Sequence, residues 1–186
     1  MESCPLAPAG HSCDNLSSMG TMKVTLLSGP VDSGKTSLLY RKVTERTGQG
    51  PSAAGILSLP VFRGGKKRGY YAYDIRSGEA MVLASELPLH LSFKFKRFFF
   101  SENGFDFARE RILASFDSPV LIIDEIGPLE LEGGGFAPVL TECVRGYTGN
   151  LVPVVRENLL DEVISAFGLG DFEIAVTSPG EEGVIP

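Results

Sequence analysis

A glycine-rich segment near the N-terminus has the residue types and spacing of a phosphate-binding loop. The run Gly29-Pro30-Val31-Asp32-Ser33-Gly34-Lys35-Thr36, followed by Ser37, fits the pattern G-x-x-x-x-G-K-[ST]. Glycines let consecutive backbone N–H groups turn toward phosphate oxygens, and a helix that starts here adds its N-terminal dipole. The Lys35 ammonium can reach the β- and γ-phosphates, and the Thr36 hydroxyl can ligate Mg²⁺. We therefore predict that Gly29–Ser37 binds a nucleoside triphosphate, such as ATP or GTP, with Mg²⁺.

A pair of carboxylates follows a short apolar run in the second half of the chain. Val120–Ile123 is wholly apolar and predicts a buried strand that ends at Asp124 and Glu125. In open α/β sheets the carboxyl ends of the strands carry the ligand, so Asp124 is placed to hold Mg²⁺ opposite Thr36. Glu125 is predicted to orient or deprotonate the attacking water. Lys35 and Glu125 are thus the expected catalytic residues.

Two further residues are predicted to lie beside the phosphates. Asp124–Gly127 fits D-x-x-G, in which the Gly127 N–H can meet the γ-phosphate. Arg156 ends the apolar run Leu151–Val155, so it is expected at the ligand edge of the sheet as a contact for phosphate or base. The glycine-rich segment Gly127–Gly135 has two interpretations: a loop that closes over the nucleotide and expels water, or a flexible surface connection.

Two basic segments lie outside these motifs. Arg63, Lys66, Lys67 and Arg68 stand on glycine-flanked turns. They are either cations that neutralise developing phosphate charge or a solvated charged hairpin, and we favour the hairpin. In Phe93–Phe107, aromatic residues are interleaved with basic ones. That pattern is typical of a single-strand nucleic-acid platform, but the acidic chain favours packing in the core.

Helices and strands alternate along the chain around these motifs. Lys23–Ser28 predicts a buried strand before the glycine loop, and Thr36–Arg46 predicts a helix after it. Asn103 is expected to cap a helix that runs to about Ser115. Further helices are predicted at Phe136–Arg145 and Asn158–Phe167, and further strands at Ala53–Leu59, Tyr70–Ile75, Ala80–Ala84, Ser92–Phe100, Leu151–Val155 and Phe172–Val176.

The alternation of strands and helices predicts an α/β fold with a mostly parallel sheet and helices on both faces. The turn at Ser77-Gly78 favours an antiparallel β-hairpin insertion within residues 61–85. Pro153 lacks an N–H, so its strand is expected to lie at an edge of the sheet or to contain a bulge. We expect one domain over residues 21–186, preceded by a disordered leader at 1–20 that is rich in Ser, Pro, Gly and Ala.

Bulk composition limits the classes of protein to which these motifs can belong. Of the 186 residues, 43% are hydrophobic and 22% are charged, as in ordinary globular proteins. The net charge of −6 argues against an unaided nucleic-acid or anionic-membrane binder. No apolar run approaches the roughly 18 residues of a membrane-spanning helix. Cys4, Cys13 and Cys143 make no disulfide framework, which predicts a cytoplasmic protein, and no motif identifies a protein partner.

Three stretches together resemble the cancer-related nucleoside-triphosphatase family, first described from thermophiles. They are the glycine loop, G-G-K-K-R-G-Y at residues 64–70, and L-I-I-D-E-I-G-P-L-E-L at residues 121–131. The likeness covers most of the chain from Lys23 onward. The resemblance implies a RecA-like P-loop NTPase fold. It also implies Mg²⁺-dependent hydrolysis of ATP, GTP and other nucleoside triphosphates with broad base tolerance.

Two positions depart from the family pattern. Pro128 stands where the family usually has a lysine, and Val31–Ser33 differs from the usual loop centre. The loop is similar to the G-x-V-D-x-G-K-T of translational GTPases, but the chain has no N-K-x-D for guanine recognition. Two other functions stay open: a small-molecule or nucleoside kinase, and a nucleotide-dependent switch module without turnover. Glu125 beside Asp124 favours water as the acceptor.

Overall fold

The computed structural model of the chain describes residues 22–45, 53–88 and 92–179. In these ranges the strands are β1 (Lys23–Gly29), β2 (Ala54–Arg63), β3 (Lys66–Asp74), β4 (Ala80–Ser85), β5 (Phe93–Phe95), β6 (Phe98–Phe100), β7 (Val120–Ile126), β8 (Asn150–Arg156) and β9 (Glu173–Thr177). The helices are α1 (Lys35–Thr44), α2 (Glu102–Leu113), α3 (Pro128–Leu131), α4 (Ala137–Gly146) and α5 (Leu160–Ala166), with the 3-10 turns η1 (Glu157–Leu159) and η2 (Leu169–Asp171). The expected leader at 1–20 lies outside the described residues.

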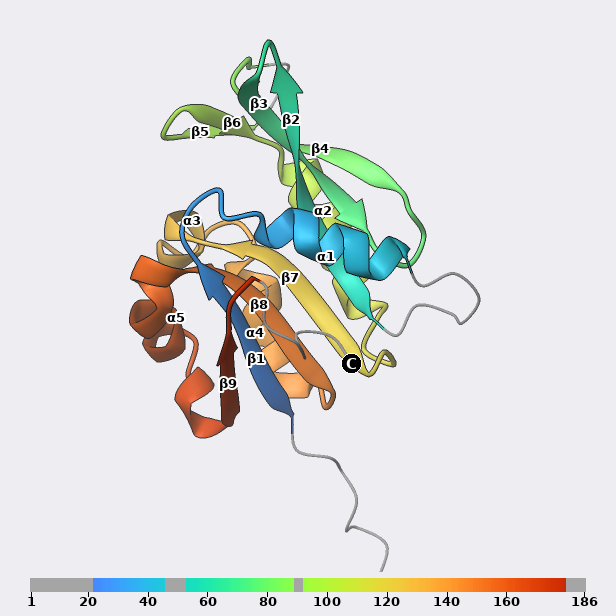
Figure 1. The fold of residues 1–186 in the computed structure, drawn as a ribbon, viewed down its shortest axis with the longest axis vertical. Helices are drawn as coiled ribbons and strands as arrows, with labels where there is room; N and C mark the ends of the chain where they lie inside the picture. Colours follow the sequence, from blue (N-terminus) through green and yellow to red (C-terminus); the bar gives the residue numbers. More distant parts are fainter. Residues whose placement is uncertain (1–21, 46–52, 89–91, 180–186) are drawn as a thin grey trace, which may run out of the picture.

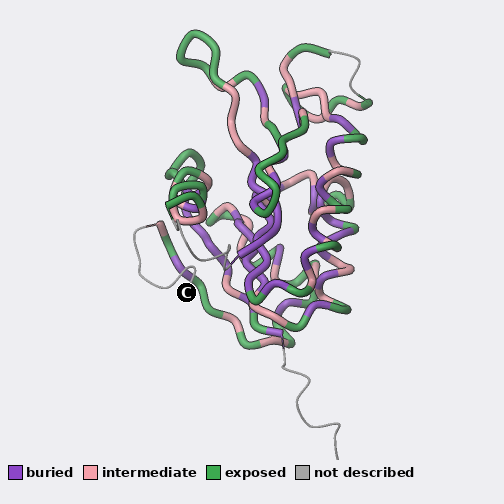
Figure 2. The backbone as a smooth tube through the Cα atoms, turned by 90° about the vertical axis from the view of Figure 1, so that its right-hand side faces the viewer, coloured by how far each residue is buried: buried purple, intermediate pink, exposed green. Residues whose placement is uncertain are grey.

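The strands of the described ranges form one nine-stranded sheet in the order β5-β6-β4-β3-β2-β7-β8-β1-β9 (Figure 1). The half from β2 to β9 is parallel. Strands β3, β4, β6 and β5 extend it from β2 as antiparallel neighbours. The predicted α/β sheet with an antiparallel insertion is therefore confirmed. The β2–β3 hairpin rises above the body of the domain in Figure 1, and the residues at its tip are exposed in Figure 2.

Helices cover both faces of the sheet, as the sequence predicts. On one face, Leu39 of α1 packs with Leu57 and Ile122 of the strands. The other face carries α2, α4 and α5, which bury Ile112 and Leu140 among other apolar side chains. This double cover explains the apolar runs of β7 and β8, because a strand covered on both faces has no solvent side. No helix in the described ranges is long and apolar enough to span a membrane.

The strand that contains Pro153 does not lie at an edge. β8 is enclosed by β7 and β1, so the predicted edge position is wrong. Pro153 is aligned with Ile123 of β7, and the β1–β8 pairing is interrupted at this residue. The register irregularity lies in β7, between Asp124 and Ile126 and opposite Val154 and Val155, and not at Pro153. Most neighbours of Pro153 in β8 are apolar and fully buried. Their burial therefore favours the centre of the sheet despite one missing hydrogen bond.

The segment Ser92–Phe100 is not the single strand that its alternating start predicts. It folds back on itself as the short strands β5 and β6, with Lys96 in the left-handed region at φ 50°. The hairpin brings the rings of Phe93 and Phe100 into a stack with centroids 5.7 Å apart. One extended strand would separate these two rings, so their apolar contact favours the hairpin.

Helix α2 begins earlier than the sequence predicts. Ser101 is its N-cap, and the Ser101 hydroxyl accepts the N–H of Gly104 at 3.0 Å, whereas Asn103 lies within the first turn. Serine and asparagine cap helices about equally well, so propensity alone does not select between them. The segment Gly127–Gly135 also contains an element that the sequence analysis did not predict. Helix α3 begins there at Pro128, a residue favoured at the first position of a helix.

Candidate active site

The loop between β1 and α1 encloses the Lys35 side chain. The Lys35 ammonium donates hydrogen bonds to the carbonyl oxygens of Gly29 and Pro30, at 2.9 and 2.8 Å. Only 7% of the residue is exposed. Burial lowers the pKa of Lys35, and the nearby charges of Glu125 and Asp124 oppose that shift. The ammonium is therefore held inside the loop, close to the acidic pair of β7.

Two residues with positive φ shape this loop. Gly34, at φ 86°, is the N-cap of α1, and Asp32 has φ 60°. Glycine adopts this region at little cost, whereas other residues do so uncommonly. Apart from Gly34 itself, its chain neighbours and the adjoining backbone of α1, no described atom lies within 4 Å of the place where a Cβ of Gly34 would stand. The backbone conformation, and not a lack of space, therefore favours glycine. The loop presents the first N–H groups of α1 as a cradle for an anion.

The two sequence motifs meet at Asp124. Burial raises the pKa of this carboxyl group to about 7, against a side-chain hydrogen bond with Thr36 that favours the charged form. Asp124 is 1% exposed, and its carboxylate accepts the N–H of Ser58 at 3.2 Å. A divalent cation would stabilise the charged carboxylate, and oxygen ligands such as those of Thr36 and Asp124 are the kind that Mg²⁺ binds. The residues present therefore fit the predicted Mg²⁺ site.

Glu125 and Arg156 form an ion pair at the carboxyl ends of β7 and β8. Arg156 Nε donates to Glu125 Oε1 at 2.6 Å, and both side chains are half-buried. Arg156 is aligned with Gly29 of β1, so the pair lies at the edge of the sheet that carries the glycine loop. A charge-assisted hydrogen bond of this kind fixes the orientation of a carboxylate. The structure thus places the predicted phosphate contact directly against the predicted base.

Glu130 holds the segment that follows β7. Its buried carboxylate accepts the N–H of Gly127 at 2.9 Å and the N–H of Phe136 at 3.2 Å. Burial raises the pKa of Glu130 to about 7, although both amides favour the charged form. The Gly127 N–H is therefore engaged by Glu130, and that bond would have to break before the amide could meet a phosphate. Sequence analysis missed Glu130, although its place three residues after Gly127 is the spacing of a capping box.

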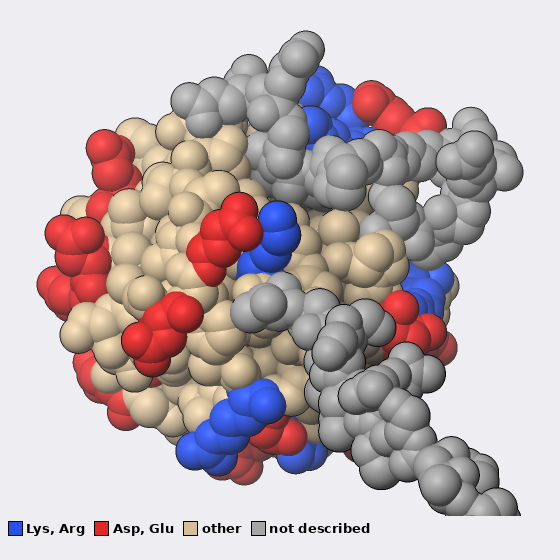
Figure 3. Space-filling model, turned by 90° about the horizontal axis from the view of Figure 1, so that it is seen from below, with Lys and Arg blue, Asp and Glu red and all other residues tan. Residues whose placement is uncertain are grey.

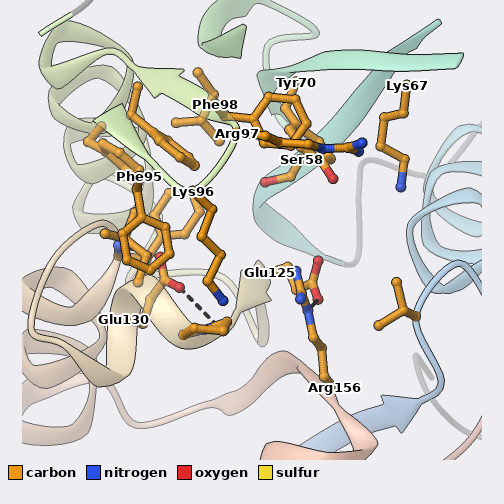
Figure 4. A pocket seen from close by; sticks show the side chains of 18 of the residues that line it. Ser58, Lys67, Tyr70, Phe95, Lys96, Arg97, Phe98, Glu125, Glu130 and Arg156 are labelled. Atoms are coloured by element: carbon orange, nitrogen blue, oxygen red, sulfur yellow. Dashed lines mark hydrogen bonds and ion pairs between the residues drawn. The ribbon is translucent and has the colours of Figure 1, made fainter. Parts of the chain in front are cut away.

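A cavity of about 380 Å³ opens beside the glycine loop, on the side of Glu125 (Figure 4). Lys35, Thr36 and Asp124 are not part of its lining, so the phosphate cradle and the cavity are adjacent rather than identical. The predicted site residues that do line the cavity are Val31, Asp32, Glu125, Gly127 and Arg156.

The basic cluster of the β2–β3 hairpin divides between the cavity and the solvent. Lys67 lines the cavity and forms an ion pair with Asp32 of the glycine loop, with its ammonium 5.6 Å from the ring centroid of Tyr70. Arg68 instead pairs with Glu86. The remaining two cations of the cluster are exposed near the hairpin tip. Lys67 alone of the four therefore reaches the glycine loop in the described structure. The pairing of β3 with β2 places Lys67 beside the glycine loop.

The aromatic segment divides between the core and the cavity: Phe105 and Phe107 of α2 pack against the core, whereas the β5–β6 hairpin forms a wall of the cavity. The rings of Phe93 and Phe100 stack on Phe105 of α2, at centroid distances of 6.4 and 5.8 Å. Phe95 and Phe98 are partly exposed and line the cavity. Among the described residues visible in Figure 3, acidic and basic side chains lie in small groups, several of them side by side, and the basic ones form no continuous surface.

The strand order and the site together define a class. The glycine-loop strand β1 and the acidic strand β7 stand on either side of β8, so both motifs end at one edge of a parallel sheet. The described structure is that of a RecA-like P-loop NTPase fold, with the loop lysine held inside the loop and a threonine at the start of α1.

Comparison with known proteins identifies the family. The sequence profile of the NTPase family matches residues 24–178. Nucleoside-triphosphatase THEP1 of Methanothermobacter thermautotrophicus is 30% identical over 141 residues, which cover 74% of this chain and 79% of the relative. Nucleoside-triphosphatase THEP1 of Thermococcus kodakarensis is 26% identical over 142 residues, which cover 73% and 77%. The chain therefore belongs to this NTPase family and is a hydrolase, which confirms the resemblance noted in the sequence.

Two solved structures share the fold. The crystal structure of THEP1 from the hyperthermophile Aquifex aeolicus has a TM-score of 0.61 at 20% identity, covering 87% of this chain and 92% of that one. The solution structure of a human cancer-related nucleoside triphosphatase has a TM-score of 0.60 at 19% identity, covering 85% and 90%. The fold is therefore shared over most of each chain, although the sequence identity is low.

Proposed function

We propose that the chain hydrolyses the terminal phosphate of nucleoside triphosphates with bound Mg²⁺ and releases a nucleoside diphosphate and phosphate. The observation that carries this proposal is the convergence of Lys35 and Thr36 with Asp124 and Glu125 at one sheet edge. In this structure loop carbonyl oxygens hold the ammonium. Phosphate oxygens would take over that ammonium when a nucleotide binds, since they are charged acceptors.

The side chains divide the chemical work between them. Thr36 and Asp124 would hold Mg²⁺, which offsets the negative charge on the phosphates. Glu125 orients a water molecule and accepts its proton as the water oxygen attacks the γ-phosphorus and the bond to the β-phosphate oxygen breaks. Arg156 holds the Glu125 carboxylate in position. Lys35 stabilises the charge that develops on the β- and γ-phosphate oxygens.

Broad base tolerance and a cytoplasmic location are part of the proposal. The chain lacks N-K-x-D for guanine recognition. Cys143 is a free, buried thiol, and burial raises its pKa to about 12. A free thiol is usual in a reducing compartment, which supports the cytoplasm.

Phosphate release from ATP, GTP, CTP and UTP, with Mg²⁺ and without any added acceptor, tests the proposed hydrolysis. We expect release from all four nucleotides, abolition by EDTA, and a loss of at least about 100-fold in kcat for Glu125→Gln. Glu110→Gln, which changes an exposed carboxylate on α2, is the matched control and should keep full activity.

Two results would replace this proposal by the other functions. Release that requires an added hydroxyl compound, with the phosphate found on that compound, would identify a kinase. Tight nucleotide binding with no release from any of the four nucleotides would identify a switch module.

A further inference from the structure

The cavity beside Glu125 is much larger than hydrolysis requires. Its volume is about 380 Å³, whereas one water molecule occupies about 30 Å³ in the liquid. Sites for small organic molecules begin at roughly 300 Å³. The space next to the attacking water is therefore large enough for a molecule of the size of a nucleotide fragment.

The cavity lies beyond the γ-phosphate, if the proposed function is correct. Lys35 and Thr36 would then hold the β- and γ-phosphates, and Glu125 would reach the water on the far side of the γ-phosphorus. Glu125 lines the cavity, whereas Lys35 and Thr36 do not. The nucleoside is attached to the opposite end of the polyphosphate. The base of the bound triphosphate should therefore leave this cavity free.

Aromatic rings form much of the cavity wall. Tyr70 of β3 and Phe98 of β6 meet edge to face with centroids 5.5 Å apart, and Phe95 stands on the other side of the β5–β6 turn (Figure 4). Phe100 and Phe105 continue the wall toward the core. Aromatic walls favour a flat ring, because a ring can stack on them or meet them edge to face.

The charges in the lining leave a cation available. Each lining carboxylate has a partner: Glu125 pairs with Arg156, Asp32 with Lys67, and Glu130 with two backbone amides.

Among the described residues, no carboxylate lies within ion-pair distance of Lys96, and its ammonium stands 5.3 Å from the ring centroid of Phe95, a contact that leaves its charge without a counter-ion. Arg97 pairs with Glu86 only loosely, at 3.7 Å. Both side chains leave the β5–β6 turn and extend over the cavity: Lys96 toward the loop after β7, and Arg97 toward Lys67 (Figure 4). The lining is thus suited to a ligand that brings a negative charge of its own.

We infer that this cavity binds a second small molecule alongside the nucleoside triphosphate: a flat aromatic ring that carries an anionic group, as in a nucleoside 5′-monophosphate. The ring packs among Tyr70, Phe95 and Phe98, and the anionic group meets Lys96. The inference rests on the proposed function for the direction of the bound polyphosphate.

Calorimetric titration of the full chain with AMP, GMP, CMP and UMP tests this second site. The protein is first saturated with Mg²⁺ and a non-hydrolysable ATP analogue, so that the glycine loop is occupied. We expect one equivalent of a monophosphate to bind, and adenosine and ribose 5-phosphate to bind more weakly than AMP. Lys96→Ala should raise Kd for the monophosphate by about tenfold or more, since it removes a charge-assisted contact. Lys94→Ala is the matched control: this lysine stands exposed on the same hairpin, outside the cavity lining, and should change nothing.

Three outcomes would overturn the inference. One is that no monophosphate binds while the analogue is present. A second is that Lys96→Ala raises Kd for the ATP analogue itself. That result would place the base of the triphosphate in the cavity. The third is an equal loss for Lys94→Ala and Lys96→Ala together with tight binding of a thymidine octanucleotide, which would assign the hairpin to single-stranded nucleic acid.

The Lys35→Ala variant separates this inference from the proposed function. In that variant the analogue should no longer bind, whereas monophosphate binding in the cavity should persist. If the nucleotide panel shows no hydrolysis but the Lys96-dependent site remains, then only the proposed function fails. If hydrolysis is present and no second ligand binds, then only the second site fails.

Discussion

Arg156 Nε donates a hydrogen bond to Glu125 Oε1 at 2.6 Å, and the two residues belong to the adjacent parallel strands β8 and β7. The arginine therefore reaches the predicted base from the next strand of the sheet, while the glycine loop lies one strand further on. We infer from this pairing that the arginine orients the proposed base, Glu125. The alternative role, direct contact with phosphate in the ground state, would show in substrate binding instead.

Replacing Arg156 should slow the chemical step more than it weakens nucleotide binding. We expect Arg156→Ala to lower kcat by about 10- to 100-fold, the effect of losing a hydrogen bond to a charged group, with KM changed less than about threefold. In a Glu125→Gln background, Arg156→Ala should lower kcat little further, because the carboxylate that Arg156 contacts is already replaced. Steady-state kinetics of the two single variants and the double variant measure this coupling.

Arg109→Ala is the control for this experiment, because Arg109 forms a comparable ion pair with Glu142 away from the site. Its kinetics should match the unaltered protein. A large rise in KM for Arg156→Ala, with kcat preserved, would assign Arg156 to phosphate binding and contradict the positioning role.

Lys35→Ala should abolish nucleotide binding or turnover. The ammonium is the buried cation of the loop, and its removal leaves phosphate charge without its main partner, so we expect Kd for Mg²⁺-ATP to rise by about 100-fold or more. Isothermal titration calorimetry measures this directly. Lys23→Ala, at the other end of β1 in an exposed ion pair with Glu173, should leave Kd unchanged. Undiminished hydrolysis by Lys35→Ala would disprove the assignment of the loop.

The parts of the site that could be predicted from sequence are those formed by residues that are adjacent in the chain. The glycine loop and the acidic pair of β7 have local patterns, and Arg156 ends an apolar strand. Each pattern fixes an end of a parallel strand, and parallel strands end at a shared edge, so the meeting of Thr36 with Asp124 follows from the fold class.

The remaining contacts depend on which strands pair, and composition does not determine that. Ser58 contacts Asp124 because β2 lies beside β7. Lys67 contacts Asp32 because the β2–β3 hairpin lies close to the glycine loop. Glu130 was missed for a local reason. The surrounding glycines indicated an open loop, whereas one buried carboxylate binds amides at both ends of the segment.

The contact between Lys67 and Asp32 should matter more for nucleotide binding than for stability. Lys67 is 19% exposed and Asp32 is 69% exposed at the side chain, and pairs this close to solvent contribute about 1 kcal/mol at most. We expect Lys67→Ala to shift Tm by only a few degrees and to raise KM for the nucleotide by about tenfold, because it removes a cation next to the loop. Lys66→Ala, one residue away and exposed, should leave both quantities unchanged, and an equal effect of the two variants would contradict the distinction.

Glu130 should make the free energy of unfolding depend on pH in an unusual direction. Burial raises the pKa of Glu130 from 4.5 to about 7, so the folded protein binds a proton more tightly than the unfolded chain does. The stabilisation is complete below about pH 4.5 and is lost as pH rises through about 7. The expected total is about 3 kcal/mol, from roughly 1.4 kcal/mol per unit of pKa shift.

Urea unfolding of the protein and of Glu130→Gln between pH 5 and pH 8 isolates this contribution. Glutamine is neutral at every pH, so the variant keeps the pH dependence of all other groups and loses only that of Glu130. The difference in free energy of unfolding, protein minus variant, should therefore fall as pH rises. Glu132→Gln, an exposed neighbour, should give a flat difference. A difference for Glu130→Gln that stays flat or rises with pH would mean that the carboxylate is charged in the folded protein. Its two amide hydrogen bonds would then outweigh the cost of burial.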